Sequence, residues 1–144
     1  MGSISFFAED VSFRPKQKIL LKNWLKNLCS RHGFRAGDIQ FIYCSDEYLL
    51  KLNQQYLQHN TYTDIITFDY SQDKTVSGDI FISIDRVSEN AKKLQLKFED
   101  ELHRVMAHGV LHLMGFKDKN PKAKKTMTAE EDKALSMFNE MVIK

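Results

Sequence analysis

The segment from about Phe98 to Met114 has the apolar spacing of an amphipathic helix, and it constrains the fold more than any other part of the chain. On a wheel of about 100° per residue, one side of this segment collects an apolar arc that must face a core. The arc consists of Phe98, Leu102, Val105, Met106 and Leu113. Gly115 follows, and a glycine just after the last periodic residue is typical of a left-handed helix end. We therefore predict a helix that packs one face on a core and ends before Gly115.

A second stripe on the same helix carries polar side chains along the edge of the apolar arc. It runs through Glu101, Arg104, His108 and His112 at spacings of three, four and four residues. A step of four residues turns about 40° and rises about 6 Å, so both imidazoles leave one face, one turn apart. Such a stripe can line a cleft, and its two histidines can share a metal ion. His103 points about 140° away from His108 and is expected to be a solvent-facing or packing residue.

The turn after this helix supplies a third donor for such an ion. Asp118 lies three residues after Gly115, where the chain can double back toward the histidines. Three protein ligands with one open position for water are typical of catalytic zinc. We therefore predict one Zn²⁺ per chain, held by His108, His112 and Asp118, with another divalent metal as the alternative.

Gly109 follows the first histidine of the pair. The zinc peptidases with an HExxH motif have a glutamate at that position as general base, so their mechanism lacks its base here. A glycine inside a helix also costs about 1 kcal/mol relative to alanine. This cost indicates close packing or close approach of another group at Gly109.

Length and composition fit one globular domain. The chain has 144 residues, 42% of them hydrophobic, which is enough to build a core. No apolar run approaches the about 20 residues of a membrane span, and the N-terminus lacks the pattern of a secretory signal. Cys29 and Cys44 have no metal or redox spacing, so free thiols in the cytoplasm are expected. Because there is no glycine-rich phosphate loop, no nucleotide cofactor is expected.

Positive charge is concentrated in two segments, although the formal net charge is only +2. Residues 14–35 carry lysines and arginines without any acid, and residues 117–125 carry five lysines beside Asp118. Each segment is either a solvated surface or a contact for the phosphates of a polyanion. The second segment adjoins the predicted metal, so Lys117, Lys119 and Lys122 are the candidate substrate-binding residues.

Strand patterns are confined to the first 85 residues, with helical patterns between and after them. Strands are predicted over residues 3–8, 39–44, 65–70 and 80–84, with turns at Gly37-Asp38 and Ser77-Gly78-Asp79. Further helices are predicted over residues 15–31, 46–57, 85–96 and 127–142. This order favours an α+β fold: a single small domain over residues 1–144 with a mixed sheet of about four strands, and the metal site on a helix and the turn after it.

The segment His108-Gly-x-Leu-His112-Leu-x-Gly115 resembles the signature of the YbeY family of rRNA-maturation endoribonucleases. Three further blocks agree with that family in the same order. They are Leu52–Tyr56 followed by Thr63–Phe68, then Gly78–Ile80, then Met127–Leu135. The resemblance spans roughly residues 40–138, which is nearly the whole domain.

The resemblance implies a metal-dependent endoribonuclease that cleaves single-stranded RNA in 16S rRNA 3′-end maturation and ribosome quality control. It implies rRNA and the small ribosomal subunit as partners in the cytoplasm, with no membrane contact, and leaves the oligomeric state open. His108 and His112 match the first two metal ligands of the family. Asp118 stands where the family usually has a third histidine. A carboxylate is a normal zinc ligand, and its charge makes the bound water less acidic.

Leu57 stands where the family usually has an arginine that is expected to hold phosphate. We expect Arg104, or a lysine of residues 117–125, to supply the missing cation. Direct attack by a metal-activated water needs no further base. Otherwise Asp64 or Asp79 is the candidate general base, with a turn or cap role as the alternative for each.

Two other functions stay open at this point. The first is a zinc peptidase or a hydrolase of another small substrate, against which the lysine-rich segment and the missing HExxH glutamate argue. The second is an RNA- or ribosome-binding assembly factor whose metal only holds the turn from Gly115 to Asp118. The leucine at position 57 lends weight to this second function.

Overall fold

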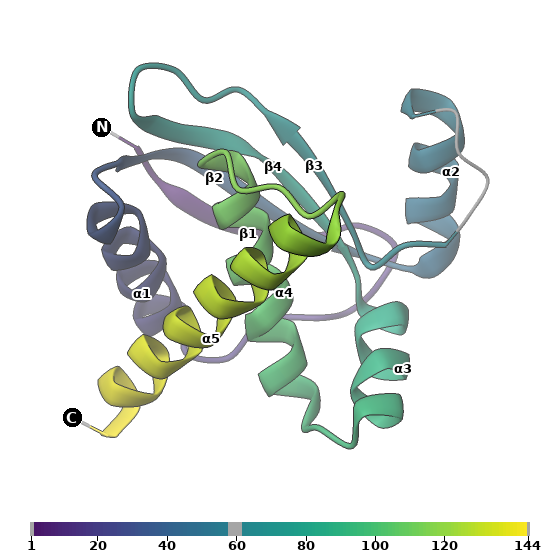
Figure 1. Ribbon diagram of the computed structural model, residues 1–144. Coiled ribbons are helices and arrows are strands. Elements are labelled where there is room, and N and C mark those ends of the chain that lie inside the picture. The colour runs from purple at the N-terminus through teal and green to yellow at the C-terminus, as the bar shows by residue number, and fades with distance from the viewer. Residues whose placement is uncertain (1, 58–61, 144) are drawn as a thin grey trace.

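A mixed sheet of four strands organises the part of the chain that the computed structural model describes, residues 2–57 and 62–143 (Figure 1). The strands lie in the order β1-β2-β4-β3, with bounds β1 (Ile4–Ala8), β2 (Arg35–Cys44), β3 (Ile65–Asp69) and β4 (Thr75–Ser83). β1, β2 and β4 are parallel, and β3 runs antiparallel to β4 at one edge. The predicted single α+β domain with a mixed sheet of about four strands is confirmed.

Helices cover both faces of this sheet. They are α1 (Lys18–Arg31), α2 (Asp46–Tyr56), α3 (Ile84–Leu94), α4 (Phe98–Leu113) and α5 (Pro121–Ile143). Buried residues of α1, α4 and α5 share the main core with one face of the sheet. On the other face, α2 packs Leu49 against Ile66 of β3 in a smaller cluster. None of the helices in the described residues has the length and apolar character to cross a lipid bilayer.

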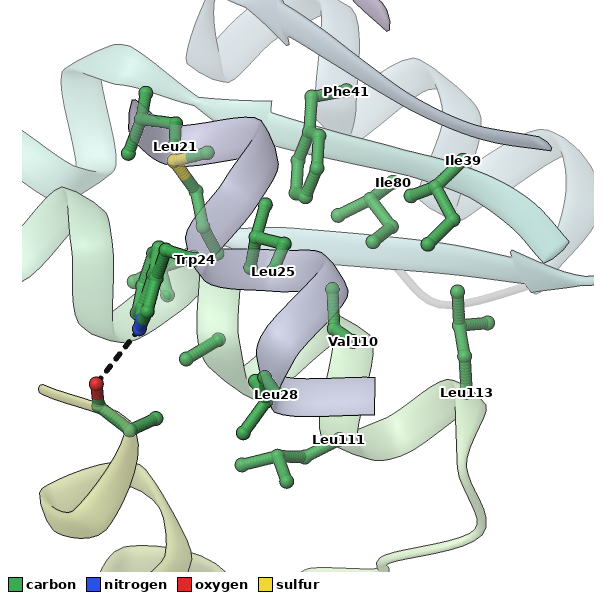
Figure 2. Packing of buried hydrophobic residues seen from close by; sticks show 14 of the residues in the cluster. Leu21, Trp24, Leu25, Leu28, Ile39, Phe41, Ile80, Val110, Leu111 and Leu113 are labelled. Carbon is green, nitrogen blue, oxygen red and sulfur yellow. Dashed lines mark hydrogen bonds between the residues drawn. The ribbon is translucent and has the colours of Figure 1, made fainter. Parts of the chain in front are cut away.

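The main core includes Trp24 of α1, which is fully buried (Figure 2). Its indole N–H donates a hydrogen bond of 2.8 Å to the backbone carbonyl of Ala134 in α5. The ring of Phe138 packs edge-on against the indole, with 5.0 Å between the ring centroids. Because a buried indole N–H needs a partner, this bond fixes α5 against α1.

The two predicted turns at Gly37-Asp38 and Ser77-Gly78-Asp79 are wrong, because both segments lie inside strands. The turn between β3 and β4 lies instead at Asp73 and Lys74, which have φ values of 48° and 67°. A Cβ atom on Gly78 would lie 2.5 Å from the carbonyl oxygen of Phe68. Gly37 and Gly78 therefore allow neighbouring strands to approach closely, and they do not form turns.

Helix α5 begins at Pro121, six residues before the predicted start at Met127. The side chain of Asn120 accepts a hydrogen bond of 2.8 Å from the backbone N–H of Ala123. Asparagine before the helix and proline at its first position are both typical of a helix start. Lys122 therefore lies in the first turn of a helix and not in a loop.

Cys29 and Cys44 are both buried free thiols. Burial raises the pKa of the Cys29 thiol to about 11. The cysteines therefore pack as small apolar side chains, and thiolate chemistry is disfavoured at Cys29.

We expect Trp24→Phe to lower the free energy of unfolding by about 2–3 kcal/mol, because it removes packed volume and the bond to Ala134. Urea denaturation followed by circular dichroism measures the change. Ile19→Ala is the control, since Ile19 lies on the same helix with 78% of its surface exposed. An equal loss in both variants would contradict the assigned role of Trp24.

Candidate active site

Helix α4 lies unusually close to the sheet at Gly109. A Cβ atom at this position would lie 2.9 Å from Cγ2 of Ile80 and 3.0 Å from Cδ1 of Ile65. Both distances are shorter than ordinary van der Waals contact, so a larger residue would push the helix outward. The close approach predicted from Gly109 is confirmed, and it brings the preceding and following turns of α4 beside β3.

A cavity of about 440 Å³ opens between α4, the start of β3 and α5. The predicted polar stripe of α4 forms one wall, because all four of its residues line the cavity. Other lining residues come from β3 and from the segment that leads into it. The lining residues are Thr63, Asp64, Ile65, Thr67, Glu101, Arg104, Val105, His108, His112, Asp118 and Glu131. The structure thus brings together Asp64, Arg104 and all three predicted metal ligands.

His108 has a different partner at each ring nitrogen. Its Nδ1 lies 2.7 Å from Oε2 of Glu131, and its Nε2 lies 3.4 Å from Oδ2 of Asp118. Burial disfavours the charged imidazolium, but the hydrogen bond and charge of Glu131, helped by Asp118 and Asp64, outweigh it and raise the pKa. The short bond at Nδ1 leaves Nε2 directed toward Asp118.

His112 lies one turn further along α4, beside β3. Its Nδ1 is 3.4 Å from Oγ1 of Thr67, and its ring centroid is 6.4 Å from that of His108. Burial lowers the pKa of His112, and the nearby charges of His108 and Lys117 lower it further. The charge of Asp118 acts in the opposite direction and is outweighed. The neutral imidazole, which is the form that binds metal ions, is therefore favoured.

Two imidazoles and a carboxylate are a normal donor set for zinc. Each histidine contacts a protein group through Nδ1, which leaves Nε2 as the nitrogen for a metal ion. The 3.4 Å between His108 Nε2 and Asp118 Oδ2 is close to the separation of two ligand atoms on one tetrahedral zinc, roughly 3.3 Å for bonds of about 2.0–2.1 Å. Within residues 2–57 and 62–143, no three His, Cys, Asp or Glu side chains are placed so that they could already hold a metal ion. The donors therefore fit zinc in kind, although their present positions do not form a complete site.

Two acids line the cavity together with the histidines: Glu101 is buried and Asp64 is half-buried. Burial raises the pKa of Asp64, although the charge of His108 opposes this shift. Burial also raises the pKa of Glu101, and the charge of Asp64 adds to it. Glu101 is only 5% exposed, and its Oε1 has no hydrogen-bond partner among the described residues. Asp79, the other predicted candidate for a general base, does not line this cavity.

Arg104 lines the cavity, but its guanidinium already forms ion pairs with two carboxylates. Nη1 lies 2.9 Å from Oε1 of Glu131, and Nη2 lies 2.6 Å from Oδ1 of Asp132. Any contact with an RNA phosphate would therefore compete with two ion pairs. The predicted phosphate-binding role of Arg104 stays a prediction.

The predicted substrate-binding lysines lie outside the cavity lining. Lys117, Lys119 and Lys122 are exposed on the segment that carries Asp118 and on the first turn of α5. Lys117 is close enough to His112 to lower its pKa. Leu57 is 45% exposed at the end of α2 and does not line the cavity.

His103 is a packing residue. Its ring lies 4.4 Å from the ring of Phe138 and 5.9 Å from that of Trp24, measured between centroids. Burial lowers its pKa, so the neutral ring is favoured. The packing alternative predicted for His103 is confirmed.

The sequence prediction missed Glu131. It lies on α5 between the buried residues Met127 and Ala134, with Phe138 one turn further along the same face. A charged residue at an apolar position of a helical stripe is a signal for a buried polar contact. The predicted helix over residues 127–142 contains this stripe, but its local sequence does not show that Arg104 and His108 of α4 are the partners of Glu131.

We expect Asp64→Asn to stabilise the metal-free protein at pH 8 and to leave its stability nearly unchanged near pH 3. The folded pKa of Asp64 lies above its unfolded value of about 3.9. The contribution of Asp64 to the stability of the wild-type protein is therefore largest below about pH 3.9, where the carboxyl is protonated in both states, and it is lost as the pH rises through the folded pKa. Urea midpoints at the two pH values test this, with the exposed Asp73→Asn as the control. A wild-type midpoint equal to that of Asp64→Asn at pH 8 would refute it.

Comparison with known proteins gives matches over nearly the whole chain. A model of the family described as Endoribonuclease YbeY matches residues 4–139. Endoribonuclease YbeY of Porphyromonas gingivalis strain W83 is 49% identical over 142 residues, which cover 99% of this chain and 94% of that protein. Endoribonuclease YbeY of Cytophaga hutchinsonii is 48% identical over 136 residues, which cover 94% of this chain and 95% of that protein.

The fold also has a solved counterpart. The solution structure of TM1509 from Thermotoga maritima is similar to this chain with a TM-score of 0.67 and 29% sequence identity. The match covers 94% of this chain and 89% of that one. The family match, the two relatives and the four motif blocks all lead to one conclusion: this chain belongs to the endoribonuclease YbeY family.

Proposed function

We propose that this chain is a zinc-dependent endoribonuclease that cleaves single-stranded rRNA in 16S rRNA 3′-end maturation and ribosome quality control. Membership of an endoribonuclease family supports hydrolysis of RNA phosphodiester bonds. The observation that carries the proposal is the cavity in which two histidines, Asp118 and the half-buried acid Asp64 lie together. The proposed partners are rRNA and the small ribosomal subunit, and the proposed compartment is the cytoplasm.

His108, His112 and Asp118 would hold the metal, since they are the donors that zinc accepts and they share one cavity. When bound, zinc supplies a water of lowered pKa and a positive charge that stabilises the reacting phosphate. The protein's own part is to direct the donors inward. The contacts of His108 with Glu131 and of His112 with Thr67 do this from the second nitrogen of each ring.

Asp64 is the proposed general base, because it lines the same cavity as the histidines. Its carboxylate takes a proton from the water as the water oxygen bonds to phosphorus. The bond from phosphorus to the leaving oxygen then breaks, and that oxygen takes up the proton and leaves as a hydroxyl group of the product RNA. The raised pKa makes Asp64 a stronger base than an exposed aspartate, and moves it toward neutral pH, where such a base is most effective. Burial of Asp64 is thus useful for catalysis although it is unfavourable for folding.

Lys117, Lys119 and Lys122 are the proposed contacts for RNA phosphates on either side of the cleaved bond. They are exposed and lie on the segment that leads from Asp118 into α5. Lysines bind phosphates mainly through charge, so these contacts hold RNA without reading its sequence. Lys117 precedes Asp118, and its charge acts on His112, so we assign it the place of the arginine missing at Leu57.

We expect wild-type protein purified without an affinity tag to contain about one zinc per chain and to cleave single-stranded RNA. His112→Ala and Asp118→Ala should lose the metal and lower cleavage by about 100-fold or more, because each removes a donor. Asp118→His should keep the metal, because it restores a nitrogen donor. Elemental analysis and gel assays on an RNA oligonucleotide measure these outcomes.

The same experiment separates the alternatives. Zinc and RNA binding without any RNA cleavage would favour an assembly factor with a structural metal. Cleavage of peptides and not of RNA would favour a peptidase. A folded Asp118→Ala protein that keeps its zinc would remove Asp118 from the site.

We expect Lys117→Ala to weaken RNA binding about equally for all sequences and to reduce the salt dependence of binding by about one counterion. The measurement is the dissociation constant of a fluorescent RNA oligonucleotide at several salt concentrations, without divalent metal. Lys51→Ala is the matched control, since Lys51 is exposed on α2, on the other face of the sheet. An unchanged slope for Lys117→Ala would exclude it as a phosphate contact.

A further inference from the structure

We propose that Glu131 is a positioning residue for His108 and that Arg104 acts through Glu131. This inference rests on the proposed metal site, since it concerns how the chain holds one of the ligands. Glu131 is 7% exposed and has a separate partner for each carboxylate oxygen. Oε2 lies 2.7 Å from His108 Nδ1, and Oε1 lies 2.9 Å from Arg104 Nη1.

The position of Glu131 in α5 does not itself require a carboxylate. Its neighbours on the same face of the helix, Met127, Ala134 and Phe138, are buried and apolar. Burial of a carboxylate is costly unless both oxygens are paired, and an apolar side chain would fill this position without that cost. The role of Glu131 therefore lies in the two groups that it binds on α4.

The bond to Glu131 determines which nitrogen of His108 is available. A carboxylate can only accept a hydrogen bond, so His108 must carry its proton on Nδ1 when it binds Glu131. In the neutral ring, the lone pair is then on Nε2, the nitrogen that lies 3.4 Å from Asp118. The same bond fixes the rotation of the ring, and such outer contacts typically change metal affinity by about 10–100-fold.

Arg104 fixes Glu131 in turn. Its guanidinium spans Glu131 and Asp132, two successive residues of α5, with distances of 2.9 and 2.6 Å. Arg104 and His108 are one turn apart on α4, so the carboxylate of Glu131 bridges them across the contact between the two helices. This arrangement gives Arg104 a role on the polar stripe that needs no contact with phosphate.

The test compares Glu131→Leu, Glu131→Gln and the control Asp132→Asn, which removes the negative charge of the other partner of Arg104 and leaves His108 untouched. Zinc affinity is measured by competition with a chromogenic chelator. The tautomer of His108 is read in the zinc-free protein from long-range ¹H–¹⁵N correlations of the ring, and urea unfolding measures stability. None of these readouts depends on RNA cleavage.

We expect Glu131→Leu to weaken zinc binding by about 10–100-fold while the protein remains folded, and to lose the Nδ1-protonated form of His108. Glu131→Gln keeps an acceptor oxygen and should recover most of the affinity, whereas Asp132→Asn should stay within about threefold of wild type. Arg104→Met should weaken binding in the wild-type background and have no further effect in Glu131→Leu.

Unchanged zinc affinity and an unchanged His108 tautomer in Glu131→Leu would overturn the inference. A loss of zinc affinity that only parallels a loss of stability in both Glu131 variants would also overturn it, because a packing role predicts that result. If the wild type binds no zinc but Glu131→Leu still changes the His108 tautomer, the positioning role stands and the proposed metal dependence fails.

Discussion

The close contact between α4 and the sheet at Gly109 determines where the chemistry of this protein lies. Without a side chain at this position, the helix backbone rests on Ile80 and Ile65. His108 and His112 then lie on either side of the contact, next to the segment of β3 that carries Asp64 and Thr67. Helix α5 closes the site from the other side, held by Trp24 in the core and by Glu131 at the cavity (Figure 1, Figure 2).

The site concentrates charge that the rest of the fold must hold in place. Asp64, Glu101 and Glu131 are carboxyl groups at one cavity, and burial raises the pKa of the first two. Only Glu131 has both oxygens paired with basic side chains, one from His108 and one from Arg104. A cavity with unpaired acids is unfavourable for stability, and this is the usual condition of a site shaped for a reaction.

Periodicity alone was sufficient to predict α4, its apolar arc and the polar stripe that lines the cavity. The structure also contains all four predicted strands. The two predicted turns that contain glycine were wrong, because Gly37 and Gly78 lie inside β2 and β4, where they allow close packing of the strands. Local sequence does not separate that use of glycine from a turn, since the difference lies in a partner strand far along the chain. Glu131 could not be assigned for the same reason: its partners, Arg104 and His108, are brought to it by the packing of α5 on α4.

The location of a metal ion tests the central claim most directly. Crystals of the zinc-loaded protein, measured on both sides of the zinc absorption edge, would show the ion by its anomalous scattering. We expect one strong peak bounded by His108 Nε2, His112 and Asp118. A zinc-loaded protein with no peak in this cavity, or with its peak at another group of side chains, would contradict the assignment of the site.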